Sequence, residues 1–350
     1  MITAELVRFT APVRRANLPV LTNGQIDVLR AALTGRKLAA CFGAGVDSTA
    51  MLVALHAAGL RPDVITFADT NGEKRATMIH LARMAEVLRR WHWPAIDVCA
   101  KKMLPSTPYS DLYGNCMANE TLPSLAFGLK SCSVKFKGLV QDQFLKGAIK
   151  GPNARPAHPL WLDAQARGER IVKLIGFDAG PADKRRSKSQ PVADKDFDYL
   201  YPLQLLGWTR ADCVEAITRA LGIGMVPIKS ACFFCPASKH WELWHLAAEE
   251  PDRFEEALAL EWNALTGRHS RFTTVEFGAD WEDLVRNADR FPSSKTTVGL
   301  GRSFAWNHWA RVNDVVDANF KVRRENKAHF LAMAAALRGD DNAFDARSCV

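Results

Sequence analysis

Short apolar runs alternate with longer segments of helical periodicity in the first third of the chain. Apolar runs at Lys37–Phe42, Val64–Ala68 and Ile96–Val98 predict strands, whereas apolar residues recur at helical spacing in Asp47–Ala58 and Lys74–Trp91. Strands that alternate with helices are typical of a parallel sheet with right-handed crossovers. The pattern therefore predicts an α/β fold with a doubly wound, mainly parallel sheet.

The middle of the chain interrupts this alternation. Residues 101–170 form an insertion that carries two cysteines. The alternation returns at Ile171–Phe177, which has the continuous apolar pattern of a buried strand. Farther on, Tyr201–Asp212 leads into a helix that Thr209 is placed to cap. We therefore expect the sheet to continue after the insertion.

Helical patterns dominate from Pro236 onwards. They cover Ser238–Ala248, Pro251–Leu265, Asp280–Asn287 and Lys327–Arg338. Before the first predicted strand, residues 1–36 hold one amphipathic segment, Gly24–Leu33, and are expected to lead into the core. We therefore divide the chain into a lead-in (1–36), an α/β domain (37–235) and a C-terminal helical region (236–350).

The first predicted strand ends in a glycine turn. Gly43 and Gly45 precede Asp47, Ser48 and Thr49, which open the next predicted helix. Glycines let backbone N–H groups point at an anion, and the helix dipole adds positive potential at the same place. The stretch lacks the lysine of GxxxxGK[ST] and the third glycine of GxGxxG. A phosphate site of another kind and an ordinary βα turn with a polar cap both fit the spacing.

Polar residues also follow the second predicted strand, at Asp69–Glu73. In parallel sheets ligands bind at the carboxyl ends of strands. We therefore expect this segment and the glycine turn to face one crevice. Taken alone, Asp69–Glu73 also fits a plain βα loop with a helix cap.

The composition is that of a globular protein, since 48% of the 350 residues are hydrophobic and 24% are charged. No apolar run is long enough to span a membrane. The N-terminus lacks the apolar core of a signal peptide, so a cytoplasmic location is expected. In that setting the eight cysteines are expected to be reduced thiols or metal ligands.

The charge balance, 46 basic against 38 acidic residues, gives a net charge of +8. Such a balance suits a polyanionic partner such as a nucleic acid, and a nucleotide pocket with an ordinary basic surface also fits it. Basic residues gather in residues 184–196, where a solvated loop and a mobile arm that contacts phosphates are both open. These residues are Lys184, Arg185, Arg186, Lys188 and Lys195.

Four cysteines form two groups. Cys232 and Cys235 make a CxxC motif in a loop before a helix, and Cys116 and Cys132 lie in the insertion. Four thiolates suit either a tetrahedral zinc or a [4Fe–4S] cluster, and the spacing does not choose between them. A redox dithiol is the competing use of CxxC, although no thioredoxin-like unit surrounds it. Three others, Cys41, Cys99 and Cys213, are predicted core residues, and Cys349 a tail thiol.

Phe42–Thr49 resembles the pyrophosphate loop (SGGxDS) of the N-type ATP pyrophosphatases, with Phe-Gly-Ala-Gly in place of Ser-Gly-Gly. Within that superfamily the chain is most similar to phosphoadenosine phosphosulfate (PAPS) reductase-like proteins, from Phe42 to about Glu261. Further matching segments follow in order: Asp69–Glu73, a strand that ends at Gly176 with arginines after it, and Pro202–Asp212. The resemblance implies a Rossmann-like sheet of the PP-loop ATPase type.

The resemblance also implies a set of site residues, with ATP and Mg²⁺ bound at the turn. Asp47 would serve the metal, and it and Ser48 would be catalytic. The implied nucleotide-binding residues are Phe42, Gly43, Ala44, Gly45, Val46, Asp47, Ser48, Thr49, Asp69, Thr70, Gly176 and Arg185. Cluster-bearing members have a cysteine in a basic segment and a late CxxC, which implies Cys116, Cys132, Cys232 and Cys235 as ligands here.

The expected reaction is cleavage of ATP to AMP and pyrophosphate, which adenylates an acceptor. Because cluster-dependent relatives insert sulfur into nucleic acids, the resemblance implies sulfur transfer to DNA or RNA, with a sulfur donor such as a cysteine desulfurase. One alternative is a sulfonucleotide reductase, although the Glu-Cys-Gly-x-His context of its nucleophile is missing around Cys349. Another is a non-catalytic nucleic-acid-binding module held together by a metal.

Overall fold

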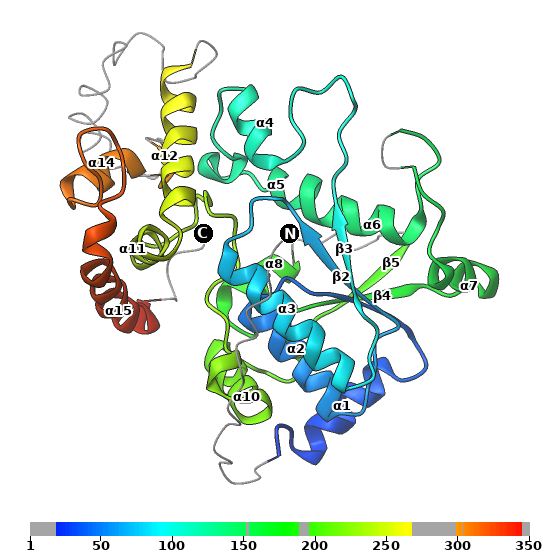
Figure 1. Cartoon of the computed structure of the whole chain (residues 1–350). Coiled ribbons are helices and arrows are strands. Elements are labelled where there is room, and N and C mark those ends of the chain that lie inside the picture. Colours follow the sequence, from blue (N-terminus) through cyan, green and yellow to red (C-terminus); the bar gives the residue numbers. More distant parts are fainter. Residues whose placement is uncertain (1–18, 152–153, 189–195, 268–298, 303, 345–350) are drawn as a thin grey trace.

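A computed structural model describes residues 19–151, 154–188, 196–267, 299–302 and 304–344, with the side chains of 339–344 excepted. Five parallel strands form one sheet in the order β3-β2-β1-β4-β5 (Figure 1). They are β1 (Lys37–Cys41), β2 (Val64–Asp69), β3 (Ile96–Ala100), β4 (Ile171–Ile175) and β5 (Phe197–Leu200). The predicted α/β class is therefore confirmed, and β5 is a strand that the apolar pattern did not reveal.

The α-helices follow the strands in the expected alternation. Before and within the first half of the sheet they are α1 (Asn23–Leu33), α2 (Val46–Ala57) and α3 (Arg75–Arg90). The insertion and the second half contribute α4 (Leu112–Ala118), α5 (Ser131–Ser133), α6 (Leu139–Lys146), α7 (Pro159–Arg167), α8 (Pro181–Lys188), α9 (Pro202–Leu205) and α10 (Arg210–Leu221). The C-terminal helices are α11 (His240–Glu249), α12 (Pro251–Thr266), α14 (Trp306–Val312) and α15 (Lys327–Phe344).

Short turns of other helix types complete the described elements. They are the 3₁₀ turns η1 (Ser124–Phe127), η3 (Ile223–Met225) and η5 (Arg324–Asn326), and the π-helical turn η2 (Val134–Gly138). π turns are rare and are often found at functional sites. Here η2 directly follows α5, which carries Cys132.

Helices cover both faces of the sheet because alternate side chains of each strand point to opposite faces. On one face, Leu38 and Ala40 of β1 pack in a cluster with residues of α1, α2, α3 and α10. On the other face, Ala39 packs with residues of α6 and α7. This arrangement is the doubly wound sheet that the alternating pattern predicts.

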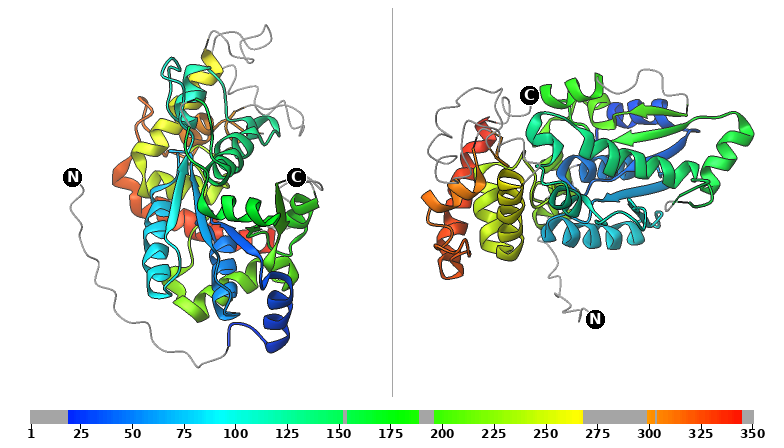
Figure 2. Two further views of the ribbon diagram at one scale, coloured as in Figure 1. Left: turned by 90° about the vertical axis from the view of Figure 1, so that its right-hand side faces the viewer. Right: turned by 90° about the horizontal axis from the view of Figure 1, so that it is seen from above.

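A separate hydrophobic cluster lies beside the sheet. It joins the insertion, through Leu112, Cys116 and Phe136, to Phe233, Phe234 and the C-terminal helices. Figure 2 shows these helices at one end of the molecule, and α4 contacts α12 (Figure 1). The insertion thus packs both on the C-terminal helices and on the strands.

Helix caps that the residue types predict are present. Thr22 and Gln25 form a capping box at α1, and Thr209 and Asp212 form one at α10. The predicted helix Asp280–Asn287 lies outside the described residues. Among the helices that are described, none has the length and apolar character needed to cross a bilayer.

Candidate nucleotide and cysteine sites

The glycine turn lies at the carboxyl end of β1, where α2 begins. Gly43 and Gly45 both donate their amide N–H to Ser48 Oγ, over 3.2 Å each. Gly43 is exposed, so the turn is open to solvent. Converging N–H groups at a helix N-terminus are the arrangement that binds anions. Ser48 Oγ occupies the convergence point, and a phosphate oxygen has the chemistry to share or replace that contact.

The backbone of this turn is strained at Ala44, which has φ +53° and is fully buried. Left-handed backbone is uncommon for residues other than glycine and is often retained at functional sites. Gly45 also has little room, because a Cβ there would lie 2.6 Å from Ser230 Oγ. Ser230 therefore covers one side of the turn, just before the CxxC motif.

Three carboxylates gather beside the turn, from Asp47 at the start of α2, Asp178 after β4 and Asp183 of α8. One oxygen of each lies within 4.8 Å of the others. Burial raises the pKa of Asp47 to about 7, against the opposing effect of Arg210, and the two neighbouring carboxylates add to the rise. Carboxylate oxygens are the ligands that Mg²⁺ prefers, so the donor set fits this ion.

Two arginines partly neutralise this group. Arg210, the first residue of α10, lies 2.8 Å from Asp47 Oδ1, and Arg186 lies 2.9 Å from Asp183 Oδ1. Arg185, which the resemblance singled out, is exposed on α8. Its part in nucleotide binding stays a prediction. The structure thus brings two arginines to the carboxylates beside the predicted loop: Arg186 from the basic stretch that the sequence singled out, and Arg210, to which the sequence gave no role.

The other residues that the resemblance implies lie in different surroundings. Phe42 is buried in the core, so only its backbone borders the turn. A Cβ on Gly176 would lie 2.7 Å from the backbone of Ser48, so this glycine permits β4 to end against α2. Asp69 Oδ1 accepts the N–H of Asn71, which has φ +56°. Asparagine tolerates this conformation, which accounts for its place in the loop.

Thr70 faces the cysteines. Its hydroxyl oxygen lies 3.1 Å from Cys232 Sγ and 3.2 Å from Glu73 Oε1. Phe233 donates its N–H to Gly72 O over 2.8 Å, and Glu73 pairs with Cys232 as an antiparallel bridge. The loop after β2 is therefore joined by hydrogen bonds to the CxxC segment.

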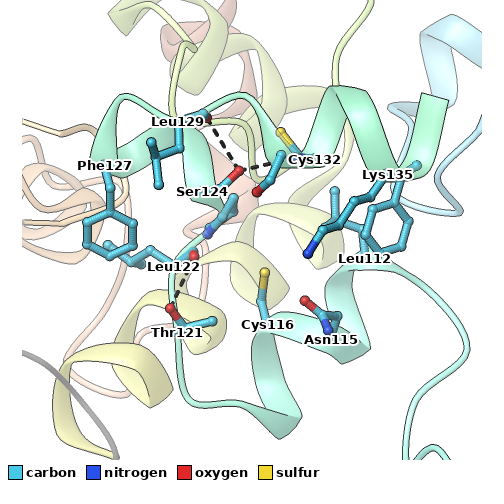
Figure 3. Close-up of a pocket in the computed structure, with 13 residues that line it drawn as sticks. Leu112, Asn115, Cys116, Thr121, Leu122, Ser124, Phe127, Leu129, Cys132 and Lys135 are labelled. Carbon is cyan, nitrogen blue, oxygen red and sulfur yellow. Dashed lines mark hydrogen bonds between the residues drawn. The ribbon is translucent and has the colours of Figure 1, made fainter. Parts of the chain in front are cut away.

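The two cysteines of the insertion line one cavity of about 220 Å³ (Figure 3). Cys116 comes from α4 and Cys132 from α5, and Asn115 and Lys135 also line the cavity. Ser124 Oγ accepts the N–H of Cys132 over 3.1 Å, which fixes the start of that helix. Burial raises the pKa of Cys116 to about 12. A metal bound here would therefore displace a thiol proton.

Cys232 and Cys235 do not line this cavity, but Cys232, Cys116 and Cys132 belong to one hydrophobic cluster. Tetrahedral zinc with bonds of about 2.3 Å holds its sulfur atoms about 4 Å apart. In the described residues, no three cysteine sulfur atoms lie within 4.8 Å of one another. A [4Fe–4S] cluster holds its thiolates farther apart, because each binds a different iron. The structure does not bring three of the thiols to zinc-binding distance of one another, so their grouping around one metal stays a prediction.

The sequence and the structure were compared with known proteins. No protein-family model matches the sequence, and no curated protein does. Among solved structures the chain is similar to the U34-tRNA thiolase NcsA from Methanococcus maripaludis with its [4Fe-4S] cluster. The identity is 10% and the TM-score 0.35, over 68% of this chain and 76% of that chain. An identity and a TM-score this low do not assign a function. The α/β fold is shown by the parallel sheet and its helices.

Proposed function

We propose that this chain is a PP-loop enzyme of the PAPS reductase-like group, which cleaves ATP to AMP and pyrophosphate and so adenylates an acceptor. One observation carries the proposal: a glycine turn at the carboxyl end of β1 directs the amide N–H groups of Gly43 and Gly45 toward the Ser48 hydroxyl, beside a group of three carboxylates. Backbone amides and a carboxylate-bound cation are two of the means by which proteins hold a triphosphate.

Each part of the turn has a role in this reaction. The amides of Gly43 and Gly45 hold phosphate oxygens, and Ser48 adds a hydroxyl. Asp47, with Asp178 and Asp183, would hold Mg²⁺, which neutralises phosphate charge when bound. An acceptor oxygen attacks the α-phosphorus, and the bond to the bridging oxygen breaks. Pyrophosphate leaves with the electron pair, and the acceptor carries AMP.

We further propose that the acceptor is a nucleic acid and that sulfur then displaces AMP. The supports are the net charge of +8 and the cavity lined by Cys116 and Cys132, which belong to one hydrophobic cluster with Cys232. Cys116, Cys132, Cys232 and Cys235 would hold a [4Fe–4S] cluster, which supplies a binding place for sulfide. The sulfur itself would come from a donor such as a cysteine desulfurase. Cys349, the thiol that a reductase would need, lies outside the described residues.

Pyrophosphate release tests the first part. The wild type is incubated with ATP and Mg²⁺, alone and with RNA or DNA, beside Asp47→Ala and the control Asp27→Ala, which changes an exposed carboxylate of α1. We expect release from the wild type and the control, stimulated by one of the nucleic acids, and none from Asp47→Ala. Undiminished release from a folded Asp47→Ala would rule out this site.

A further inference from the structure

The ion pair between Arg210 and Asp47 is built by the fold and not by helix periodicity. Arg186 and Asp183 are three residues apart on one helix, so their pairing is local. Arg210 comes from a different element, 163 residues after Asp47. Such a contact exists only because α10 is brought to the first turn of α2.

Three contacts fix where Arg210 begins its helix. Thr209 donates its hydroxyl and its N–H to Asp212, which sets the first turn of α10. Trp208 O accepts the N–H of Ala179, which ties this turn to the loop that carries Asp178. The guanidinium is thereby held beside the three carboxylates, while the side chain of Arg210 stays 45% exposed and able to move.

Mg²⁺ must therefore compete with the Arg210 guanidinium for Asp47. A divalent ion bound by the three carboxylates repels a guanidinium at the same oxygen atoms. Asp47 comes two positions after Gly45, so a guanidinium freed from Asp47 starts beside the residues of the glycine turn. Its planar fork of donors matches two oxygens of a phosphate better than an ammonium does.

We propose that Arg210 is a phosphate-binding residue that exchanges partners: it neutralises Asp47 in the nucleotide-free protein and moves to the triphosphate when Mg²⁺ and ATP bind. This inference rests on the proposed function, and it adds a residue that the loop motif does not contain. In the reaction Arg210 stabilises the negative charge that develops on the departing pyrophosphate.

The exchange predicts opposite effects from one substitution. Arg210→Met removes the competitor for Asp47, so Mn²⁺ without nucleotide binds several-fold more tightly. The same change removes a phosphate contact, so ATP binds more weakly and pyrophosphate release falls by about 100-fold. Arg210→Lys keeps the charge but loses the fork. It is expected to leave Mn²⁺ affinity near the wild-type value and to lower release to an intermediate rate.

The experiment measures three quantities on the full chain: Mn²⁺ affinity by electron paramagnetic resonance, ATP affinity by calorimetry, and pyrophosphate release. Arg219→Met is the matched control, because Arg219 pairs with Glu215 on the same helix, α10. The inference holds if Arg210→Met tightens Mn²⁺ binding while it weakens ATP binding. It is overturned if all three quantities fall together, as in a distorted site, or if none changes.

The two proposals fail separately. A wild type that releases no pyrophosphate with any acceptor refutes the proposed function. Arg210 is then judged on the affinities alone, and unchanged ATP affinity in Arg210→Met refutes the exchange. Release by the wild type together with full activity in Arg210→Met refutes the exchange and leaves the proposed function intact.

Discussion

The hydroxyl of Thr49 lies 2.9 Å from Nε2 of His80, between the first turn of α2 and the middle of α3. The same hydroxyl donates its one proton to Gly45 O over 2.8 Å. It therefore accepts from His80, which assigns the ring proton to Nε2. Burial lowers the pKa of His80 to about 4, so the ring is neutral at physiological pH. A buried histidine thus holds the carbonyl of the glycine turn through one threonine.

Replacing His80 is expected to loosen the turn. His80→Leu removes the donor to Thr49 and leaves a similar volume, and loss of one buried hydrogen bond of about 1.4 kcal/mol corresponds to about tenfold weaker ATP binding. His80→Gln places an amide donor near the same point and should restore most of the affinity. Calorimetric titration with ATP measures both. Equal affinities in the two variants would show that the donor to Thr49 does not matter for ATP binding.

The pH dependence of ATP cleavage should follow Asp47. Only the ionised carboxylate can hold Mg²⁺, and the pKa of Asp47 is about 7. At limiting Mg²⁺, pyrophosphate release should therefore rise as pH increases through about 7, and excess Mg²⁺ should move the midpoint to lower pH. Rate profiles from pH 5.5 to 9 measure this. A flat profile across that range would contradict the assignment of Asp47.

The raised pKa of Asp47 should also affect stability: the free energy of unfolding should fall with rising pH, whereas the rate of ATP cleavage should rise. The pKa of Asp47 in the folded protein is above its ordinary value of 3.8, so the folded state binds more protons than the unfolded state between about pH 4 and pH 7. The free energy of unfolding should then fall as pH rises through this window, with Asp183 adding in the same direction. Asp47→Asn should reduce the slope in urea denaturation series. An unchanged slope would contradict the shift.

The cysteine assignment predicts loss of metal from single variants. Cys235→Ser should strip most of the bound iron, because one of four thiolates is lost. Cys213→Ala is the control, since Cys213 is fully buried in the core of the α/β part. Iron, sulfide and zinc analysis with absorption spectra after anaerobic purification gives the answer. Iron content that is unaltered in Cys235→Ser would show that the ligand is elsewhere.

A buried charge network beside the cysteines should matter for folding. Glu242 accepts from Lys74 over 2.7 Å and from Lys229 over 2.9 Å, and Lys74 is 4% exposed. Glu242→Gln leaves the buried Lys74 and the half-buried Lys229 without a countercharge, so it should cost about 3 kcal/mol. Glu86→Gln, which breaks exposed pairs on α3, should cost less than about 1 kcal/mol. Urea unfolding compares the two, and equal costs would contradict the role of the network.

The strand and helix order of the α/β part could be predicted because its signals are local. Apolar runs marked β1, β2 and β4, and Thr209 marked the start of α10. β5 was missed because it spans only four residues, of which one is buried. The helices of the insertion were also missed. Apolar residues of α4 pack on C-terminal helices that lie more than a hundred positions away, whereas those of α6 and α7 pack on the sheet.

The candidate site shows the same division. The glycine turn and its Asp-Ser pair are contiguous, so their types and spacing were informative. Asp178, Arg210 and His80 reach the turn from three other elements, and only the packing of β4, α10 and α3 brings them there. The hydroxyl oxygen of Thr70 lies 3.1 Å from Cys232 Sγ, a contact that the sequence did not indicate, and its part in nucleotide binding stays a prediction. A residue's neighbours in the chain therefore predicted its loop but not its partners.

Amide chemical shifts test the central claim most directly. The chain has 22 glycines, so ¹⁵N-glycine labelling gives a spectrum in which Gly43 and Gly45 can be assigned through labelled preceding residues. Addition of Mg²⁺ and a non-hydrolysable ATP analogue is predicted to shift both amides, and to do so with an affinity that Asp47→Ala abolishes. An analogue that leaves both amides unmoved, or that binds Asp47→Ala equally well, would contradict a phosphate site at this turn.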